Sequence, residues 1–168
     1  TYIEPFNQTK TMKNNKQPTK TPDTKELTDL TMNFLNSAMT MKELRGMSDK
    51  EMEAIYASDY NMYNHGKFQQ SEEIFQLLCQ LDPYKVKYWM GLGASFHMRK
   101  EYSKALEAYS FAAMIDMKNP YPSFHAGDCL VQLKDYQHAE QAFLAAAQIC
   151  EETKTHPEVA KQARALME

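Results

Sequence analysis

Apolar residues recur along the chain every three or four positions, which is the period of an amphipathic helix. The first stripe consists of Leu27, Leu30, Phe34 and Ala38. It follows Asp23, which forms a capping-box pattern with Glu26. We therefore predict a helix over residues 23–39. No segment shows the two-residue alternation of a β-strand, and the pattern as a whole predicts an all-α fold.

Two further capping boxes mark the next helices. Thr40 and Glu43 form one box, and Gly46 is suited to end the short helix that follows. Ser48 and Glu51 form the other box, which predicts that a longer helix begins there.

From residue 48 onward the pattern repeats at a constant offset of 34 residues. The aligned sets are Phe68, Tyr102 and Tyr136; Ser71, Ala105 and Ala139; Phe75, Tyr109 and Phe143; Leu78, Ala112 and Ala146. A 34-residue period with small and aromatic residues at these spacings is typical of the tetratricopeptide repeat, a helix–turn–helix unit. We predict three tandem repeats, at about 52–85, 86–119 and 120–153, stacked as an α-solenoid.

The repeat explains which residues should be buried. Gly93, Gly127, Ala105 and Ala139 are small, so the two helices of a repeat, A and B, can approach closely, with an aromatic residue at the head of helix B beside them. The first repeat should place in its core mainly Ile55, Met62, Phe68 and Phe75.

The predicted organisation has three parts. Residues 1–22 are a flexible tail, residues 23–47 an N-terminal helical region, and residues 48–168 hold the three repeats and a C-terminal capping helix. The capping helix spans residues 157–167 and starts with proline at a favourable first position. Since the chain begins at Thr1, Met12 is a candidate natural start, with the preceding residues added by cloning.

Composition narrows the class of protein without changing this organisation. The chain has 168 residues, a net charge of −3, 43% hydrophobic residues and 24% charged residues, which suits a single globular domain. The charge gives no bias toward nucleic acid or anionic lipid. No apolar run approaches the ~20 residues of a membrane span, and no signal peptide is visible. The basic tail lacks interleaved aromatics and is expected to be solvated, without binding nucleic acid.

The chemistry-bearing residues predict neither an enzyme nor a cofactor or metal site. Cys79, Cys129 and Cys150 are far apart, which favours reduced, buried thiols in a cytosolic protein. His97 and His125 lack partners at ligand spacing. No nucleophile motif or phosphate-binding glycine loop is present.

A binding surface is the stronger prediction. In this type of repeat, helix A lines a concave groove, and its groove positions are taken by Tyr56, Tyr60, Tyr63, Lys87, Met90, Ala94, His97, Tyr121, Phe124, Asp128 and Val131. The first three residues stand on one helical face, where rings can grip an extended peptide and hydroxyls can bond its backbone. These aromatics could instead be ordinary core, but the repeat assigns other residues to that role.

Three segments resemble the class II type III secretion chaperones, the LcrH/SycD family: "IYASDYNMYNHGKF" (55–68), "YWMGLGASFHMRKEYSKALEAYSFA" (88–112) and "FHAGDCLVQLKDYQHAEQAF" (124–143). The resemblance covers about residues 40–150. Ser58 and Asp59 depart from the family pattern, in which Ala-Tyr usually precedes the second tyrosine, and this departure is expected to affect packing of the first repeat rather than the groove face.

The resemblance implies a small bacterial cytosolic chaperone. Such proteins hold hydrophobic translocators, the pore-forming proteins of the injection apparatus, before secretion. A short, extended, proline-containing segment of the translocator would occupy the groove. Homodimers would form through the N-terminal helical region, here through Leu27, Leu30, Phe34 and Ala38. No stable membrane association and no nucleic-acid partner are implied.

The alternative is a general tetratricopeptide adaptor that captures another peptide, for example an acidic C-terminus. That mode needs several basic groove residues to neutralise two carboxylates. Only Lys87 among the predicted groove residues is basic, so we favour the chaperone.

Overall fold

The structure is a computed structural model that describes residues 40–167. All regular secondary structure within this range is α-helical, which confirms the predicted fold class. The predictions for the tail, for the helix over residues 23–39 and for its apolar stripe of Leu27, Leu30, Phe34 and Ala38 lie outside the described residues.

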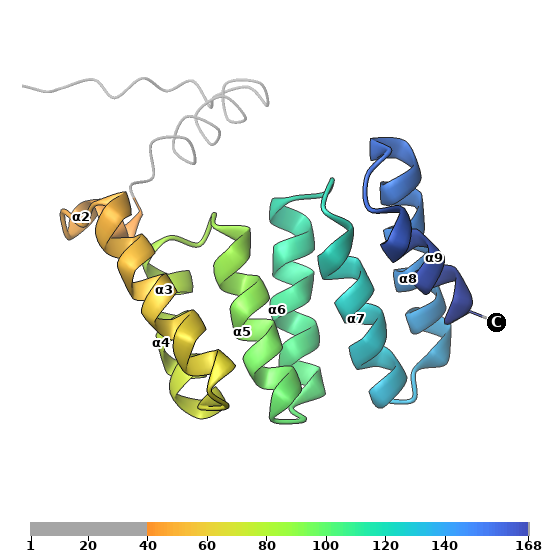
Figure 1. The fold of residues 1–168 in the computed structure, drawn as a ribbon, viewed down its shortest axis with the longest axis horizontal. Helices are drawn as coiled ribbons and strands as arrows, with labels where there is room; N and C mark the ends of the chain where they lie inside the picture. Colours follow the sequence, from red (N-terminus) through yellow and green to blue (C-terminus); the bar gives the residue numbers. More distant parts are fainter. Residues whose placement is uncertain (1–39, 168) are drawn as a thin grey trace, which may run out of the picture. The chain divides into compact units, whose positions relative to one another are not determined.

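The helices follow one another side by side in chain order (Figure 1). Their bounds are Met41–Leu44 (α2), Asp49–Asn64 (α3), Phe68–Leu81 (α4), Val86–Met98 (α5), Tyr102–Ile115 (α6), Pro120–Gln132 (α7), Tyr136–Thr153 (α8) and Pro157–Ala165 (α9). Helices α4, α6 and α8 therefore begin at Phe68, Tyr102 and Tyr136, the aromatic residues that the sequence aligns. The 34-residue repeat of the sequence is thus also the spacing between the first residues of these three helices.

Side chains and turns set the helix ends. The main-chain N–H of Thr40 donates to Glu43 Oε2 at 2.8 Å, and the N–H of Ser48 donates to Glu51 Oε2 at 2.8 Å, so both predicted capping boxes are confirmed. The turn between helices A and B places Gly66, Lys100 and Lys134 at φ values of 75°, 63° and 64°. A left-handed residue thus recurs at the same point of each repeat.

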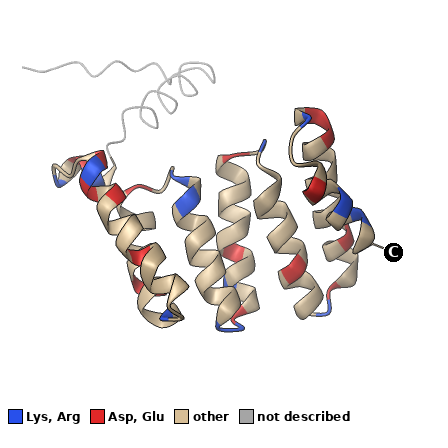
Figure 2. Cartoon of the chain, in the orientation of Figure 1, with Lys and Arg blue, Asp and Glu red and all other residues tan. Residues whose placement is uncertain are grey.

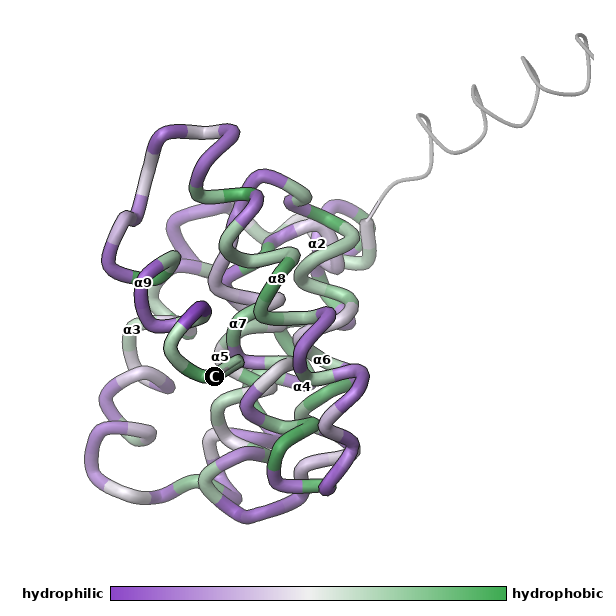
Figure 3. Tube along the Cα trace, turned by 90° about the vertical axis from the view of Figure 1, so that its right-hand side faces the viewer, coloured by the Kyte–Doolittle hydropathy of each residue, from purple (hydrophilic) through white to green (hydrophobic). Residues whose placement is uncertain are grey.

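Consecutive helices pack against each other from α3 to α9. Helix α3 also contacts α5, and α7 contacts α9, so these helices share one face, while α4, α6 and α8 lie behind them (Figure 1). Hydrophobic colour lies mainly within the helices and hydrophilic colour mainly in the turns that join them (Figure 3). Every second helix is therefore available to line a shared surface.

Glycines allow helices A and B of one repeat to pack closely. A Cβ atom added to Gly93 would lie 2.6 Å from Cε1 of Tyr109, and one added to Gly127 would lie 2.6 Å from Cε1 of Phe143. Ala105, the small residue of the facing helix, is fully buried. The packing role predicted for these small residues is confirmed.

Two expectations about the aromatic and apolar positions need correction. Phe75 is buried and Ile55 packs against the core as predicted, but Ile55, Met62 and Phe68 are only half-buried. The fully buried residues of α3 are Met52 and Asp59. The first repeat lies at the end of the described array, so fewer helices cover its outer residues. Tyr136 is 65% exposed and does not fill the space beside the small residues as expected. Among the helices of residues 40–167, none is long and apolar enough to cross a lipid bilayer.

Candidate functional site: an aromatic groove between helices α3, α5 and α7

A pocket of about 450 Å³ opens between the A helices of successive repeats. Its lining residues are Tyr56, Tyr60, Tyr63, Phe75, Val86, Lys87, Met90, Gly91, Ala94, Asn119 and Tyr121. They come from α3, from α5 and from the start of α7, and Phe75 reaches in from α4. Segments up to two repeats apart in the sequence therefore form one surface.

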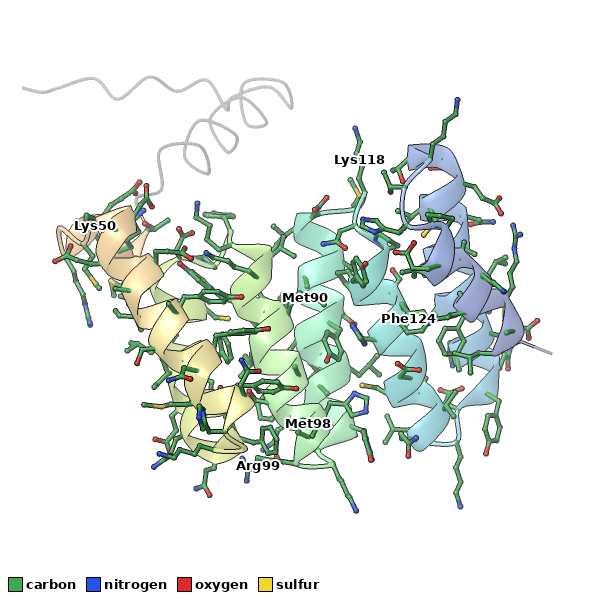
Figure 4. All side chains as sticks on the ribbon, in the orientation of Figure 1. Lys50, Met90, Met98, Arg99, Lys118 and Phe124 are labelled. Carbon is green, nitrogen blue, oxygen red and sulfur yellow. The ribbon has the colours of Figure 1, made fainter. Side chains whose placement is uncertain are left out.

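Most of the predicted groove residues meet in this pocket. Tyr56, Tyr60, Tyr63, Lys87, Met90, Ala94 and Tyr121 all line it. His97, Phe124, Asp128 and Val131 do not line it, although all four are half-buried on α5 or α7. Met90 on α5 and Phe124 on α7 are labelled in Figure 4. For these four residues, a part in peptide binding stays a prediction.

The three tyrosines of α3 form one wall of the pocket, which we call the tyrosine wall. The rings of Tyr56 and Tyr60 stack with centroids 6.2 Å apart, and Tyr56 meets the edge of Phe75 at 6.0 Å. Tyr60 is 53% exposed, while Tyr56 and Tyr63 are half-buried. Burial raises the pKa of Tyr56 and of Tyr63, so both hydroxyls stay protonated and can donate hydrogen bonds near neutral pH. The wall offers apolar ring surface and polar handles together.

Lys87 is engaged within the pocket. Its ammonium lies 4.3 Å from the centroid of the Tyr56 ring and forms an ion pair with Glu53. Helix α5 carries no other Lys, Arg, Asp or Glu, and α7 carries only Asp128 (Figure 2). The groove therefore presents mainly apolar and aromatic surface, with one cation already paired.

Gly91 and Phe75 form the floor of the pocket. A Cβ atom added to Gly91 would lie 2.2 Å from Cζ of Phe75, so the ring tip occupies the space that any other residue would fill. Sequence reasoning did not predict that a ring from α4 would reach the groove at Gly91. The sequence did contain a sign of this close contact, because position 91 holds glycine where the third repeat holds His125.

The groove residues outside the pocket form a second polar and aromatic group. His97 Nδ1 lies 3.9 Å from Cys129 Sγ, and burial lowers the pKa of His97. His125 stacks on Tyr109 with centroids 5.3 Å apart. Phe124 packs against Phe143 at 5.6 Å. Within residues 40–167, no group of three or more His, Cys, Asp or Glu side chains is placed to hold a metal ion.

Another hollow, of about 640 Å³, lies between α8 and α9. Lys154, Lys161 and Arg164 line it, and Arg164 pairs with Glu151. It shares no residue with the predicted groove and lacks aromatic side chains. The pocket between α3, α5 and α7 is the better candidate for a peptide site, because it combines apolar walls with a few polar groups.

Comparison with known proteins finds relatives both by sequence and by structure. Residues 86–119 match the profile of the family described as Tetratricopeptide repeat. The chain is 30% identical to Low calcium response locus protein H of Yersinia pestis over 148 residues, which is 88% of each chain. The structure is similar to that of PcrH in complex with the chaperone binding region of PopB, with 37% identity, a TM-score of 0.70 and coverage of 72% of this chain and 98% of PcrH.

A third relative is the type III secretion translocator chaperone SycD of Yersinia enterocolitica, in a structure described as an alternative dimer. Identity is 29%, the TM-score is 0.67, and the match covers 71% of this chain and 91% of SycD.

Proposed function

Because this chain belongs to the family of type III secretion translocator chaperones, we propose that it binds hydrophobic translocators through an extended segment in its groove. Binding takes place in the bacterial cytoplasm and keeps the translocator soluble and competent for secretion. The protein acts by capture and release, without catalysing a reaction. The observation that carries this proposal is the pocket of Tyr56, Tyr60, Tyr63, Met90 and Ala94, which unites the groove positions predicted from two repeats.

The chemistry of the pocket suits an extended peptide with apolar side chains. The rings of the tyrosine wall and Met90 can cover one apolar or proline side chain, while protonated tyrosine hydroxyls can bond the peptide backbone. Lys87 is held by Glu53 and Tyr56, so it is not free to clamp a terminal carboxylate. This pairing favours a translocator segment over the acidic C-terminus that a general adaptor would capture.

The groove extends beyond the pocket in this proposal. His97, Phe124, Asp128 and Val131 follow on the same helices and receive the remainder of the segment. A homodimer forms through Leu27, Leu30, Phe34 and Ala38, by analogy with the dimer of SycD. Light scattering tests this dimer. A variant that carries both Leu30→Glu and Phe34→Glu is expected to form a smaller species and to keep its helical content.

Two substitutions of alanine by glutamate test the groove. Ala94 is half-buried and lines the pocket, while Ala105 is 0% exposed between helices of the same repeat. Ala94→Glu is expected to keep the helical circular dichroism spectrum and to weaken binding at least ~10-fold, since an unsatisfied buried polar group costs ~1–3 kcal/mol and a charged one costs more. Ala105→Glu is expected to unfold the array, because that position allows no larger side chain.

The assay is calorimetric titration with the chaperone binding region of PopB, the ligand of the related PcrH. Ala57→Glu is the matched control, since Ala57 is exposed on α3 and does not line the pocket. A folded Ala94→Glu variant that binds as tightly as the Ala57→Glu control would place the ligand outside the groove.

A further inference from the structure

Asp59 is a fully buried carboxyl group on α3 whose nearest hydrogen-bonding opportunity, the Ser71 hydroxyl, is not taken up with good geometry. Its side chain is 0% exposed on α3, and neither carboxylate oxygen makes a hydrogen bond of normal geometry within residues 40–167. Burying an unpaired carboxylate is costly, so its presence calls for a physical account.

The internal repeat shows how unusual this position is. Asp59 stands 34 residues before Gly93 and 68 before Gly127, the two glycines that aromatic rings contact closely. Ser71 likewise stands where the other repeats have Ala105 and Ala139. The first repeat therefore has a carboxyl group and a hydroxyl group where the other two repeats have glycine and alanine.

A serine hydroxyl from α4 adjoins Asp59, and a second serine, from α5, adjoins that hydroxyl. From α4, Ser71 faces it and is also fully buried. From α5, the buried Ser95 lies 3.4 Å from the Ser71 hydroxyl and donates to the carbonyl of Gly91 at 3.0 Å. Burial raises the pKa of Asp59 to about 6, and the Ser71 hydroxyl only partly offsets this.

The charged groups near these helices are engaged elsewhere. Glu72 on α4 is paired with Arg99, which follows α5, and Lys87 on α5 is paired with Glu53. The titratable side chain of α3 that senses Asp59 is Tyr56, whose pKa the carboxylate helps to raise. No cation among the described residues is therefore paired with Asp59.

Asp59 also occupies a decisive place in α3. Only Met52 and Asp59 are fully buried on this helix, so they are its two anchors in the array. Tyr56, Tyr60 and Tyr63 lie within about one turn of Asp59 along the helix. A displacement of α3 at Asp59 would therefore displace the tyrosine wall as well.

We propose that Asp59 is a proton-sensitive positioning residue that controls the tyrosine wall of the groove. As a neutral acid it packs with Ser71, which adjoins Ser95, and holds α3 against α4 and α5. As a carboxylate it favours opening of α3 toward water. Its effect on peptide affinity rests on the proposed function, whereas its effect on α3 itself does not.

The direction of the pH effect follows from the two environments. The pKa of Asp59 is about 6 in the packed state and 3.8, its ordinary value, when the group is open to water. The packed state is therefore favoured fully below pH ~4, and this advantage is lost as the pH rises through ~6. With these two pKa values, the ratio of packed to open molecules falls about tenfold between low pH and pH 5, and about a hundredfold between low pH and pH 8.

Hydrogen exchange of α3 amides, corrected for the intrinsic pH dependence of exchange, measures this opening. Asp59→Asn removes the charge with little change of shape. It should protect α3 about tenfold more than the wild type at pH 5 and about a hundredfold more at pH 8. Helix α7 should show no such difference. Asn61→Asp is the matched control, because it adds a carboxylate at an exposed position of α3, and it should behave as the wild type.

Asp59→Ala provides a second neutral variant in case the asparagine amide disturbs packing, and it should also lack the pH dependence. Parallel exchange profiles of wild type and both neutral variants would overturn the proposal. Titration with the chaperone binding region of PopB then tests the link to binding. The advantage of Asp59→Asn over wild type should grow from pH 5 to pH 8, and an advantage that does not grow would refute the link. Absence of binding by every variant at every pH would count against the proposed function, while the exchange profiles would still decide the role of Asp59.

Discussion

Replacing Gly93 by alanine tests whether close contact between helices A and B holds the repeats together. The added Cβ atom would lie 2.6 Å from Cε1 of Tyr109 and within 2.9 Å of two further ring atoms. Carbon atoms pack best at ~3.5–4.0 Å, so the ring must retreat by about 1 Å. Tyr109 is 2% exposed and has His125 stacked against it at 5.3 Å, which leaves the ring little room to move.

The expected cost combines two opposing effects. Overpacking a well-filled core costs ~1–3 kcal/mol, and we take the upper end because the ring is enclosed. Alanine gains ~1 kcal/mol over glycine in helix propensity. The net loss is therefore ~2 kcal/mol, or about 4–8 °C in Tm for a chain of this size.

Thermal and denaturant unfolding followed by circular dichroism measure this loss. Gly127→Ala repeats the experiment in the next unit, since its Cβ would lie 2.6 Å from Cε1 of Phe143. A double-mutant cycle with Tyr109→Leu isolates the contact, because alanine at position 93 should cost little once the ring is gone. If Gly93→Ala leaves Tm unchanged or raises it in the wild-type background, the steric account of the repeat is wrong.

Three further outcomes are expected. Lys100→Gly should raise stability by ~1 kcal/mol, because Lys100 has a φ of 63° and glycine adopts this region without steric cost; chemical denaturation decides it, and a loss of stability would contradict it. Cys79 and Cys129 should resist a thiol reagent at pH 8 in the native protein and react on unfolding, since burial raises the pKa of both thiols to about 12; rapid native labelling seen by mass spectrometry would contradict this. Lys87→Met should change the free energy of unfolding by less than ~1 kcal/mol, because water reaches both partners of the ion pair, with Lys87 38% and Glu53 60% exposed; a larger change in urea unfolding would show that the pair has a structural role.

Features that depend on neighbouring residues or on the repeat period could be predicted from the sequence. The capping boxes of Thr40 and Ser48 act over three residues, and the structure forms both. The 34-residue period placed the heads of α4, α6 and α8 and identified Gly93 and Gly127 as close-packing positions. Repetition made these predictions strong, because each repeat is a copy of the same local solution to burying an apolar helix face.

Which side chains meet across helices depends on how the helices pack. The tyrosine wall follows from residue spacing within one helix, but the ring of Phe75 under Gly91 and the pairing of Lys87 with Glu53 require the relative placement of two helices. Asp59 shows the two sources of information in conflict. The 34-residue period aligns it with the close-packing positions Gly93 and Gly127, whereas its residue type favours an exposed position. The packing of α3 against α4 and α5 resolves the conflict, because it removes the carboxyl group from water.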